Sequence, residues 1–161
     1  MRRTLSTVML GAIALAGSVV ALPASAGAQD AGGTLRFTEV FSGRAPDPTG
    51  TIVATGVITG VGRVVATTDD ADVWGFPGLG TILFSRQVVT STDDSDPATC
   101  IERFSGVETF RLYGGTGQLS GLVVEGTFTD RGVFIADHAG GGCAQDSGSL
   151  FVVATGLGTT R

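Results

Sequence analysis

One glutamate, Glu39, lies within a stretch of apolar residues whose alternation is typical of a β-strand. Leu35, Phe37 and Phe41 share one face of this predicted strand with Glu39, because side chains two positions apart point the same way. A carboxylate on an apolar face is costly to bury unless it is paired or used. Either Glu39 faces the interior, or a bulge turns it outward. Inside, loss of hydration would raise the pKa of Glu39 and make it a proton donor or hydrogen-bond partner near neutral pH.

Glu108 raises the same question on a second predicted strand, where its face also carries Phe104, Phe110 and Leu112. Glu39 and Glu108 are therefore the candidate interior acids, and no catalytic residue is assigned. Further ionisable side chains interrupt apolar stretches in the same way, namely Arg86, Arg103, Arg111, Glu125 and Asp137, with Tyr113 near by.

The single histidine, His138, follows Asp137 and could act as a base oriented by that carboxylate. Ser120, Ser147 and Ser149 are candidate nucleophiles, but none lies in the G-x-S-x-G turn that presents a catalytic serine. We therefore favour a histidine at a strand end, near the rim of the fold, over a hydrolytic triad.

Two acidic runs, 69–72 and 93–96, offer the hard oxygen ligands that calcium prefers. Neither is followed by the glycine and the distal glutamate of an EF-hand loop. Two cysteines and one histidine also cannot supply the four ligands of a usual structural zinc site. We interpret the acidic runs as solvated turns and predict no metal.

The two cysteines, Cys100 and Cys143, are predicted to form a disulfide, since the N-terminal segment described next places them in an oxidising compartment. Such a bridge requires Cα atoms within about 7 Å of each other. The alternative is a catalytic thiol, which would need a base such as His138 close to it.

Residues 1–28 have the pattern of a secretory signal peptide. Arg2 and Arg3 precede the uncharged, mostly apolar stretch 5–22, and small residues occupy the positions before Ala28 that signal peptidase reads. Cleavage is expected after Ala28, or alternatively after Ala26, and the mature protein is expected to be secreted. The alternative is an uncleaved membrane anchor, for which eighteen weakly apolar residues are barely long enough.

The composition excludes some classes of function but does not identify one. The chain has 161 residues and a net charge of −5, which argues strongly against an electrostatic nucleic-acid binder. It contains neither nucleotide-binding glycine motif, so no cofactor is predicted. Its length suits one domain, predicted to span 29–161.

That domain is predicted to be all-β. Residues with β-branched side chains are abundant, and many of the 26 glycines fall inside strand-like stretches, as at the bends of a barrel. We predict a single closed antiparallel barrel of about eight strands, or a sandwich. The expected strands are 34–41, 51–66, 81–91, 101–113, 119–129, 132–138 and 149–155, and the expected core is Leu35, Phe37, Ile82, Phe84, Phe110, Leu112, Phe128, Phe134 and Val152.

The segment 110–121 joins two of these strands through Gly114, Gly115, Thr116 and Gly117, followed by Gly121. It resembles the G-G-[ST]-G-x-[FYL]-x-G hairpin of the allene oxide cyclase and dirigent superfamily. In this interpretation the glycines form a tight, bulged structural turn, because they accept positive φ values.

The resemblance implies an eight-stranded barrel with a hydrophobic lumen, and a bacterial secreted relative of proteins that cyclise a reactive epoxide or steer radical coupling. The family's catalytic residues are not placed on this sequence. We expect a small apolar or aromatic ligand in the lumen. The alternatives are a cofactor-free cyclase or isomerase that uses a lumen carboxylate such as Glu39, and a cell-envelope interaction protein whose lumen is filled. The sequence does not indicate the oligomeric state.

Overall fold

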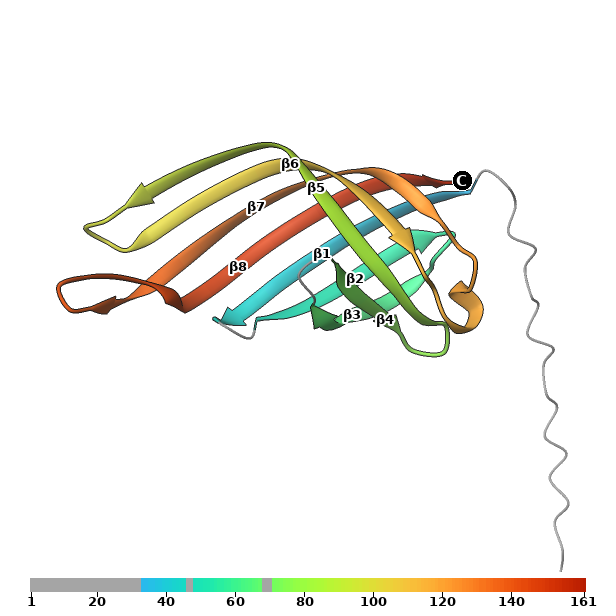
Figure 1. The fold of residues 1–161 in the computed structure, drawn as a ribbon, viewed down its shortest axis with the longest axis horizontal. Coiled ribbons are helices and arrows are strands. Elements are labelled where there is room, and N and C mark those ends of the chain that lie inside the picture. Colours follow the sequence, from blue (N-terminus) through green and yellow to red (C-terminus); the bar gives the residue numbers. More distant parts are fainter. Residues whose placement is uncertain (1–32, 46–47, 68–70) are drawn as a thin grey trace, which may run out of the picture.

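The computed structural model describes residues 33–45, 48–67 and 71–161, so the predicted signal peptide, 1–28, lies outside the described residues. Most of the described residues are in strands (Figure 1). None of their helices is long and apolar enough to span a membrane. The strands are β1 (Thr34–Arg44), β2 (Thr49–Gly56), β3 (Gly60–Thr67), β4 (Asp72–Phe76), β5 (Gly80–Asp96), β6 (Ile101–Tyr113), β7 (Val124–Ala139) and β8 (Gly142–Thr160).

These strands form one antiparallel sheet in which each strand pairs with its neighbours in sequence. β1 also pairs with β8, from Thr34 opposite Thr159 to Arg44 opposite Ser149, so the sheet closes into a ring. The prediction of an all-β, antiparallel fold is confirmed.

The strands differ greatly in length. β4 has 5 residues, whereas β8 has 19. β4 pairs with β5 only up to Phe84, so the rest of β5 and its partners run beyond the short strands. Figure 1 shows the β5–β6 and β7–β8 hairpins projecting to the left of the ring. We call this projecting part, residues 86–107 and 130–148, the hairpin extension.

Aromatic side chains fill the interior of the closed sheet at the end away from the hairpin extension, which we call the closed end. Trp74 stacks on Phe84 with ring centroids 4.4 Å apart, and Phe37 meets Trp74 edge-on at 5.0 Å. Phe110 and Phe128 complete this aromatic cluster. Side chains alternate between core and solvent along each strand, which explains why the alternation of the sequence predicted the inner face.

Most of the predicted core is buried. The buried members are Leu35, Phe37, Ile82, Phe84, Phe110, Leu112 and Phe128, whereas Phe134 and Val152 are only half-buried. The exceptions lie on parts of β7 and β8 that are not enclosed by the short strands, so the inner face there stays partly open.

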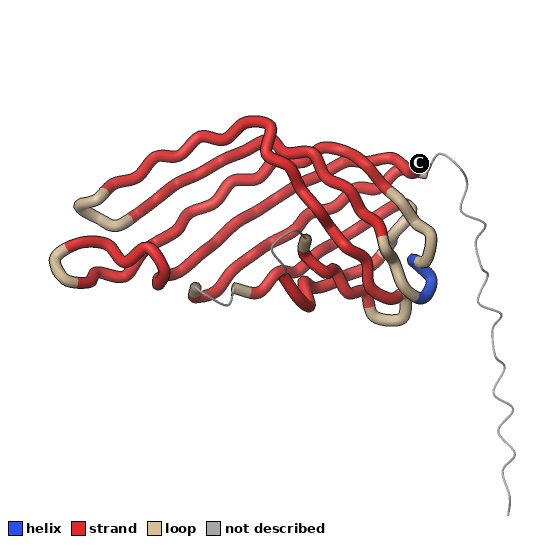
Figure 2. Tube along the Cα trace, viewed as in Figure 1, coloured by secondary structure: helices blue, strands red, loops and turns tan. Residues whose placement is uncertain are grey.

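The connection between β6 and β7 is longer than the tight turn predicted for Gly114–Gly117. It spans 114–123 and contains one 3₁₀ turn, η1 (Gly117–Leu119), drawn blue in Figure 2. The amide of Thr116 donates to the carbonyl of Thr81 at 2.8 Å, which fixes the connection to β5. Leu119 is thereby buried in the closed end instead of starting a strand as predicted.

Three further strand predictions need correction. The stretch 51–66 is two strands, β2 and β3, and the strand β4 was not predicted. The stretches 119–129 and 132–138 were predicted as two strands separated by a turn at 130–132. They belong in large part to one strand, β7, because the chain does not turn there. Gly132 lies within this strand. A glycine is needed there because a Cβ atom would lie 2.4 Å from the ring of Phe104.

Candidate functional site

An open cavity of about 840 Å³ lies between the ring and the hairpin extension. β1 contributes Phe41, β6 contributes Phe104, and β8 contributes Leu150 and Val152, all half-buried. Its polar lining includes the ionisable groups Asp72, Arg86, Asp93, Glu108 and Asp130. The cavity therefore combines an apolar wall with a concentration of carboxyl groups.

Glu39 lies one inward position nearer the closed end than the cavity wall. It pairs with Ala154 across β1 and β8, whereas the next inward pair, Phe41 and Val152, lines the cavity. Glu39 is 5% exposed, so no bulge turns it outward. Glu39 therefore faces the interior, which is the first of the two alternatives that the sequence left open.

The pKa of Glu39 is raised to about 8, mainly because the carboxyl is buried and also because the carboxylate of Asp72 is near. The guanidinium of Arg86 and the indole N–H of Trp74 act in the opposite direction. No hydrogen bond of good geometry forms, since Oε1 of Glu39 and Nε1 of Trp74 are both buried without a partner. Glu39 is thus protonated near neutral pH and can donate a hydrogen bond or a proton.

Glu108 lines the cavity itself and is 7% exposed. Burial raises its pKa; Arg86 lowers that pKa and Asp130 raises it. Nε of Arg86 lies 4.0 Å from Oε2 of Glu108, which is too far for a hydrogen bond, and Oε2 has no other partner. A buried carboxyl oxygen at the cavity wall is therefore unsatisfied.

Three further carboxyls of the cavity lining, Asp72, Asp93 and Asp130, were not predicted as site residues. Asp72 is buried and accepts a hydrogen bond of 2.8 Å from Oγ1 of Thr67. Asp130 lies over Gly106, and its Oδ1 is buried without a hydrogen bond. Asp72 was assigned to an acidic turn, although its alternation with Trp74 was a signal for an inward strand position. Asp130 was not recognised because the sequence 130–132, Asp-Arg-Gly, is typical of a turn.

Several ionisable residues that could have been interior lie outside the cavity. Arg111 alternates with two buried residues and points outward, where its Nε is 3.6 Å from Oε1 of Glu125. Its guanidinium also lies over the ring of Tyr113, 5.5 Å from the centroid. Arg103 is exposed on the same outer face. Only Arg86 of this group reaches the cavity.

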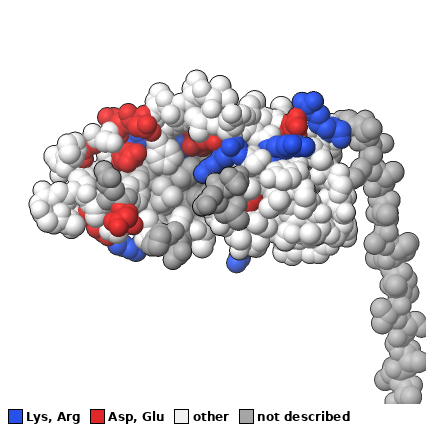
Figure 3. Space-filling model, in the orientation of Figure 1, with Lys and Arg blue, Asp and Glu red and all other residues white. Residues whose placement is uncertain are grey.

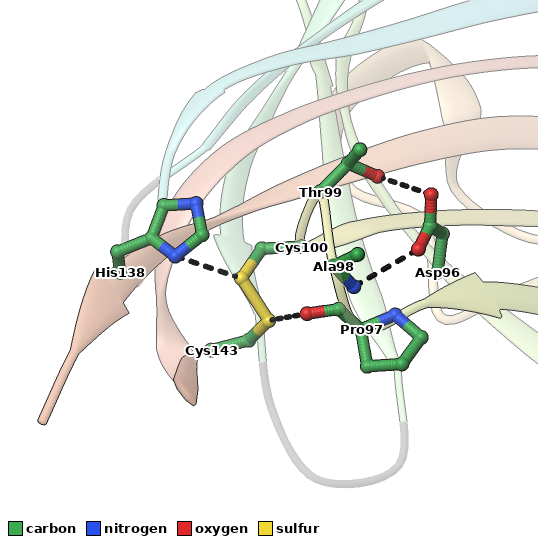
Figure 4. The surroundings of a disulfide bond; sticks show 7 residues. All are labelled: Asp96, Pro97, Ala98, Thr99, Cys100, His138 and Cys143. Atoms are coloured by element: carbon green, nitrogen blue, oxygen red, sulfur yellow. Dashed lines mark hydrogen bonds between the residues drawn. A yellow bond between two sulfur atoms is a disulfide. The ribbon is translucent and has the colours of Figure 1, made fainter. Parts of the chain in front are cut away.

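The cysteines form the predicted disulfide between the tips of the two hairpins (Figure 4). The Cα atoms of Cys100 and Cys143 are 5.3 Å apart, within the predicted limit. Nδ1 of His138 lies 3.4 Å from Sγ of Cys100, yet the sulfur is already bonded, so the catalytic thiol is not supported. Asp137 pairs with Arg44, and His138 is exposed.

The acidic run 93–96 is the end of β5 and not a turn in itself. Its last carboxylate, Asp96, accepts hydrogen bonds from Oγ1 of Thr99 at 2.8 Å and from the amide of Ala98 at 2.9 Å (Figure 4). These bonds, the Thr99 bond first, lower the pKa of Asp96. Asp69 and Asp70 of the other run lie outside the described residues. Within the described ranges, no three metal-ligating side chains come together.

Comparisons of the chain with family models, curated proteins and solved structures returned no match. The resemblance to the allene oxide cyclase and dirigent superfamily therefore stays a prediction that depends on residues 110–121.

Proposed function

We propose that the protein is a secreted binding protein that holds one small, mainly apolar molecule in the cavity. The cavity volume of about 840 Å³ carries this proposal, because ligand pockets usually measure roughly 300–1,000 Å³. Its apolar wall with a few converging polar groups is the usual composition of such pockets. The closed sheet would serve as a rigid barrel around the ligand, as the family resemblance implies, without a cofactor.

One observation favours a second candidate, a cofactor-free cyclase or isomerase. The pKa of about 8 leaves Glu39 protonated at neutral pH, as a general acid requires. Glu39 adjoins the cavity wall but is not part of it, so a substrate would have to reach the carboxyl past Asp72 or Arg86. Binding is therefore the primary proposal. The aromatic cluster fills only the closed end, which disfavours an interaction protein with a filled lumen.

Filling the cavity should abolish binding without harming the fold. Ser91 lines the cavity and pairs with Gly106, which has no side chain of its own and over which the carboxyl of Asp130 lies. We expect Ser91→Phe to weaken binding of the neutral probe N-phenyl-1-naphthylamine by about tenfold or more, since the ring takes the ligand's place. Fluorescence titration measures the change.

The matched control is Thr38→Phe, because Thr38 is exposed and alternates with inward Phe37 and Glu39 on β1. Its affinity should equal that of the wild type. The proposal is wrong if the wild type does not bind the probe, if Ser91→Phe binds it unchanged, or if Thr38→Phe weakens binding equally.

A further inference from the structure

The ionisable groups on the cavity wall are strongly unbalanced in sign. Four carboxyl side chains line it, Asp72, Asp93, Glu108 and Asp130, whereas Arg86 is the only basic side chain among the described lining residues. The side chain of Arg86 is 59% exposed, and its charge acts on both Glu39 and Glu108. One solvent-exposed guanidinium therefore cannot neutralise the wall.

Two carboxyl oxygens on this wall have no hydrogen-bond partner. Oε2 of Glu108 is buried on β6, and Oδ1 of Asp130 is buried on β7. Glu108 pairs with Phe128 and Gly106 pairs with Asp130, so the two acids are diagonal neighbours on one inner face. Leaving a buried acceptor unsatisfied is costly, and a charged one more so. A group that donates to both oxygens would remove this cost.

Two aromatic rings continue from these oxygens toward the hairpin tips, beside two further carboxyls of the same face, Asp93 and Glu102. Phe104 lines the main cavity, two residues along β6 from Gly106. Phe134 lines a second cavity of about 480 Å³ at the tips, and it pairs with Glu102, the next inward residue after Phe104. The inner face can thus take an elongated apolar body, and an aromatic ring near a bound cation adds to its binding.

The distribution of surface charge favours a positively charged ligand. In Figure 3 most of the acidic surface gathers over the hairpin extension, and most of the basic surface lies nearer the closed end. The whole chain also has a net charge of −5. A negative field around the entrance attracts cations and speeds their association.

We propose that the ligand is an organic monocation, a protonated amine on an apolar chain or ring. Its ammonium group donates to Glu108 and Asp130, and its apolar body lies along Phe104 toward Phe134. This assignment rests on the proposed binding function and adds the chemical class of the ligand. An ammonium has several donors, so it can satisfy both oxygens at once.

The test uses three probes with the same ten-carbon chain: decylamine, decanol and decanoate. Each competes with N-phenyl-1-naphthylamine for the wild-type protein near neutral pH and at low salt. We expect decylamine to bind about tenfold or more tighter than decanol, because hydrogen bonds to charged groups are strong, and decanoate to bind most weakly.

The double variant Glu108→Gln with Asp130→Asn should reduce the preference for decylamine over decanol to near unity while keeping the affinity for decanol. The matched control is Asp94→Asn, since Asp94 is exposed and pairs with Arg103 on the outer face. It should keep the full preference. The wild-type series alone tests the idea if the double variant does not fold.

Three results would overturn this inference. Decanol binding as tightly as decylamine would show that charge is not recognised, and decanoate binding most tightly would make Arg86 the deciding group. An unchanged preference in a folded double variant would place the ammonium elsewhere. All three leave the binding function standing, whereas failure of every neutral and charged probe to bind would remove the binding function itself.

Discussion

Glu39→Gln should stabilise the protein near pH 8 and flatten the pH dependence of its unfolding. The pKa of Glu39 is about 8 in the folded protein, against an ordinary value of 4.5. Between these two pH values the folded state retains a proton that the unfolded state has released, so the free energy of unfolding falls as pH rises. The loss is roughly 4 kcal/mol by the time pH 8 is reached. A glutamine side chain does not ionise, so the variant should not lose this free energy as the pH rises.

Urea unfolding of wild type and variant at a series of pH values between 4.5 and 8 measures this difference. The difference between the two proteins isolates Glu39 from Glu108, whose raised pKa acts in the same direction. Asp94→Asn is the control and should follow the wild type at every pH, because Asp94 is exposed. Parallel profiles of wild type and Glu39→Gln would mean that Glu39 ionises freely in the folded protein.

Removing the disulfide should cost the protein about 4 kcal/mol of unfolding free energy. Cys100 and Cys143 are 43 residues apart in the sequence. For a loop of this size, the chain-entropy relation gives a stabilisation of about 4 kcal/mol. The bridge joins the two hairpin tips, which the short strands do not support. The double variant Cys100→Ser with Cys143→Ser should therefore unfold at clearly lower urea concentration than the wild type.

A second readout locates the effect. Amide hydrogen exchange in the double variant should rise most at the tips, around Thr99 and Gly142, and least in the closed end around Trp74. A change in unfolding free energy below about 1 kcal/mol would show that pairing of β6 with β7 already holds the hairpins together.

The inner face of the long strands could be predicted from sequence because alternation depends only on neighbouring residues. Phe37 and Glu39, and likewise Glu108 and Phe110, were placed on the same side correctly. β4 was not predicted, since it has 5 residues and begins at an aspartate beside an acidic run. A strand that short carries too few alternations to stand out.

Other features depend on contacts across the sheet that the sequence does not display. Gly132 appears in a turn-like sequence, but its missing side chain makes room for the ring of Phe104. Gly156 similarly faces the ring of Phe37, 2.2 Å from where a Cβ would stand. The burial of Asp72, and of Oδ1 of Asp130, follows from the same cross-strand packing. The cavity exists because β5 to β8 extend beyond the short strands. This difference in length cannot be recognised from any single segment of the sequence.

The central claim is that a small molecule binds on the inner face between the ring and the hairpin extension. Chemical-shift mapping of the isotope-labelled protein, titrated with N-phenyl-1-naphthylamine, tests it most directly. We predict saturable shifts at Phe41, Phe104 and Val152, with little change at outward Thr127 and Phe151. Shifts confined to outward residues, or none at saturating probe, would contradict the account.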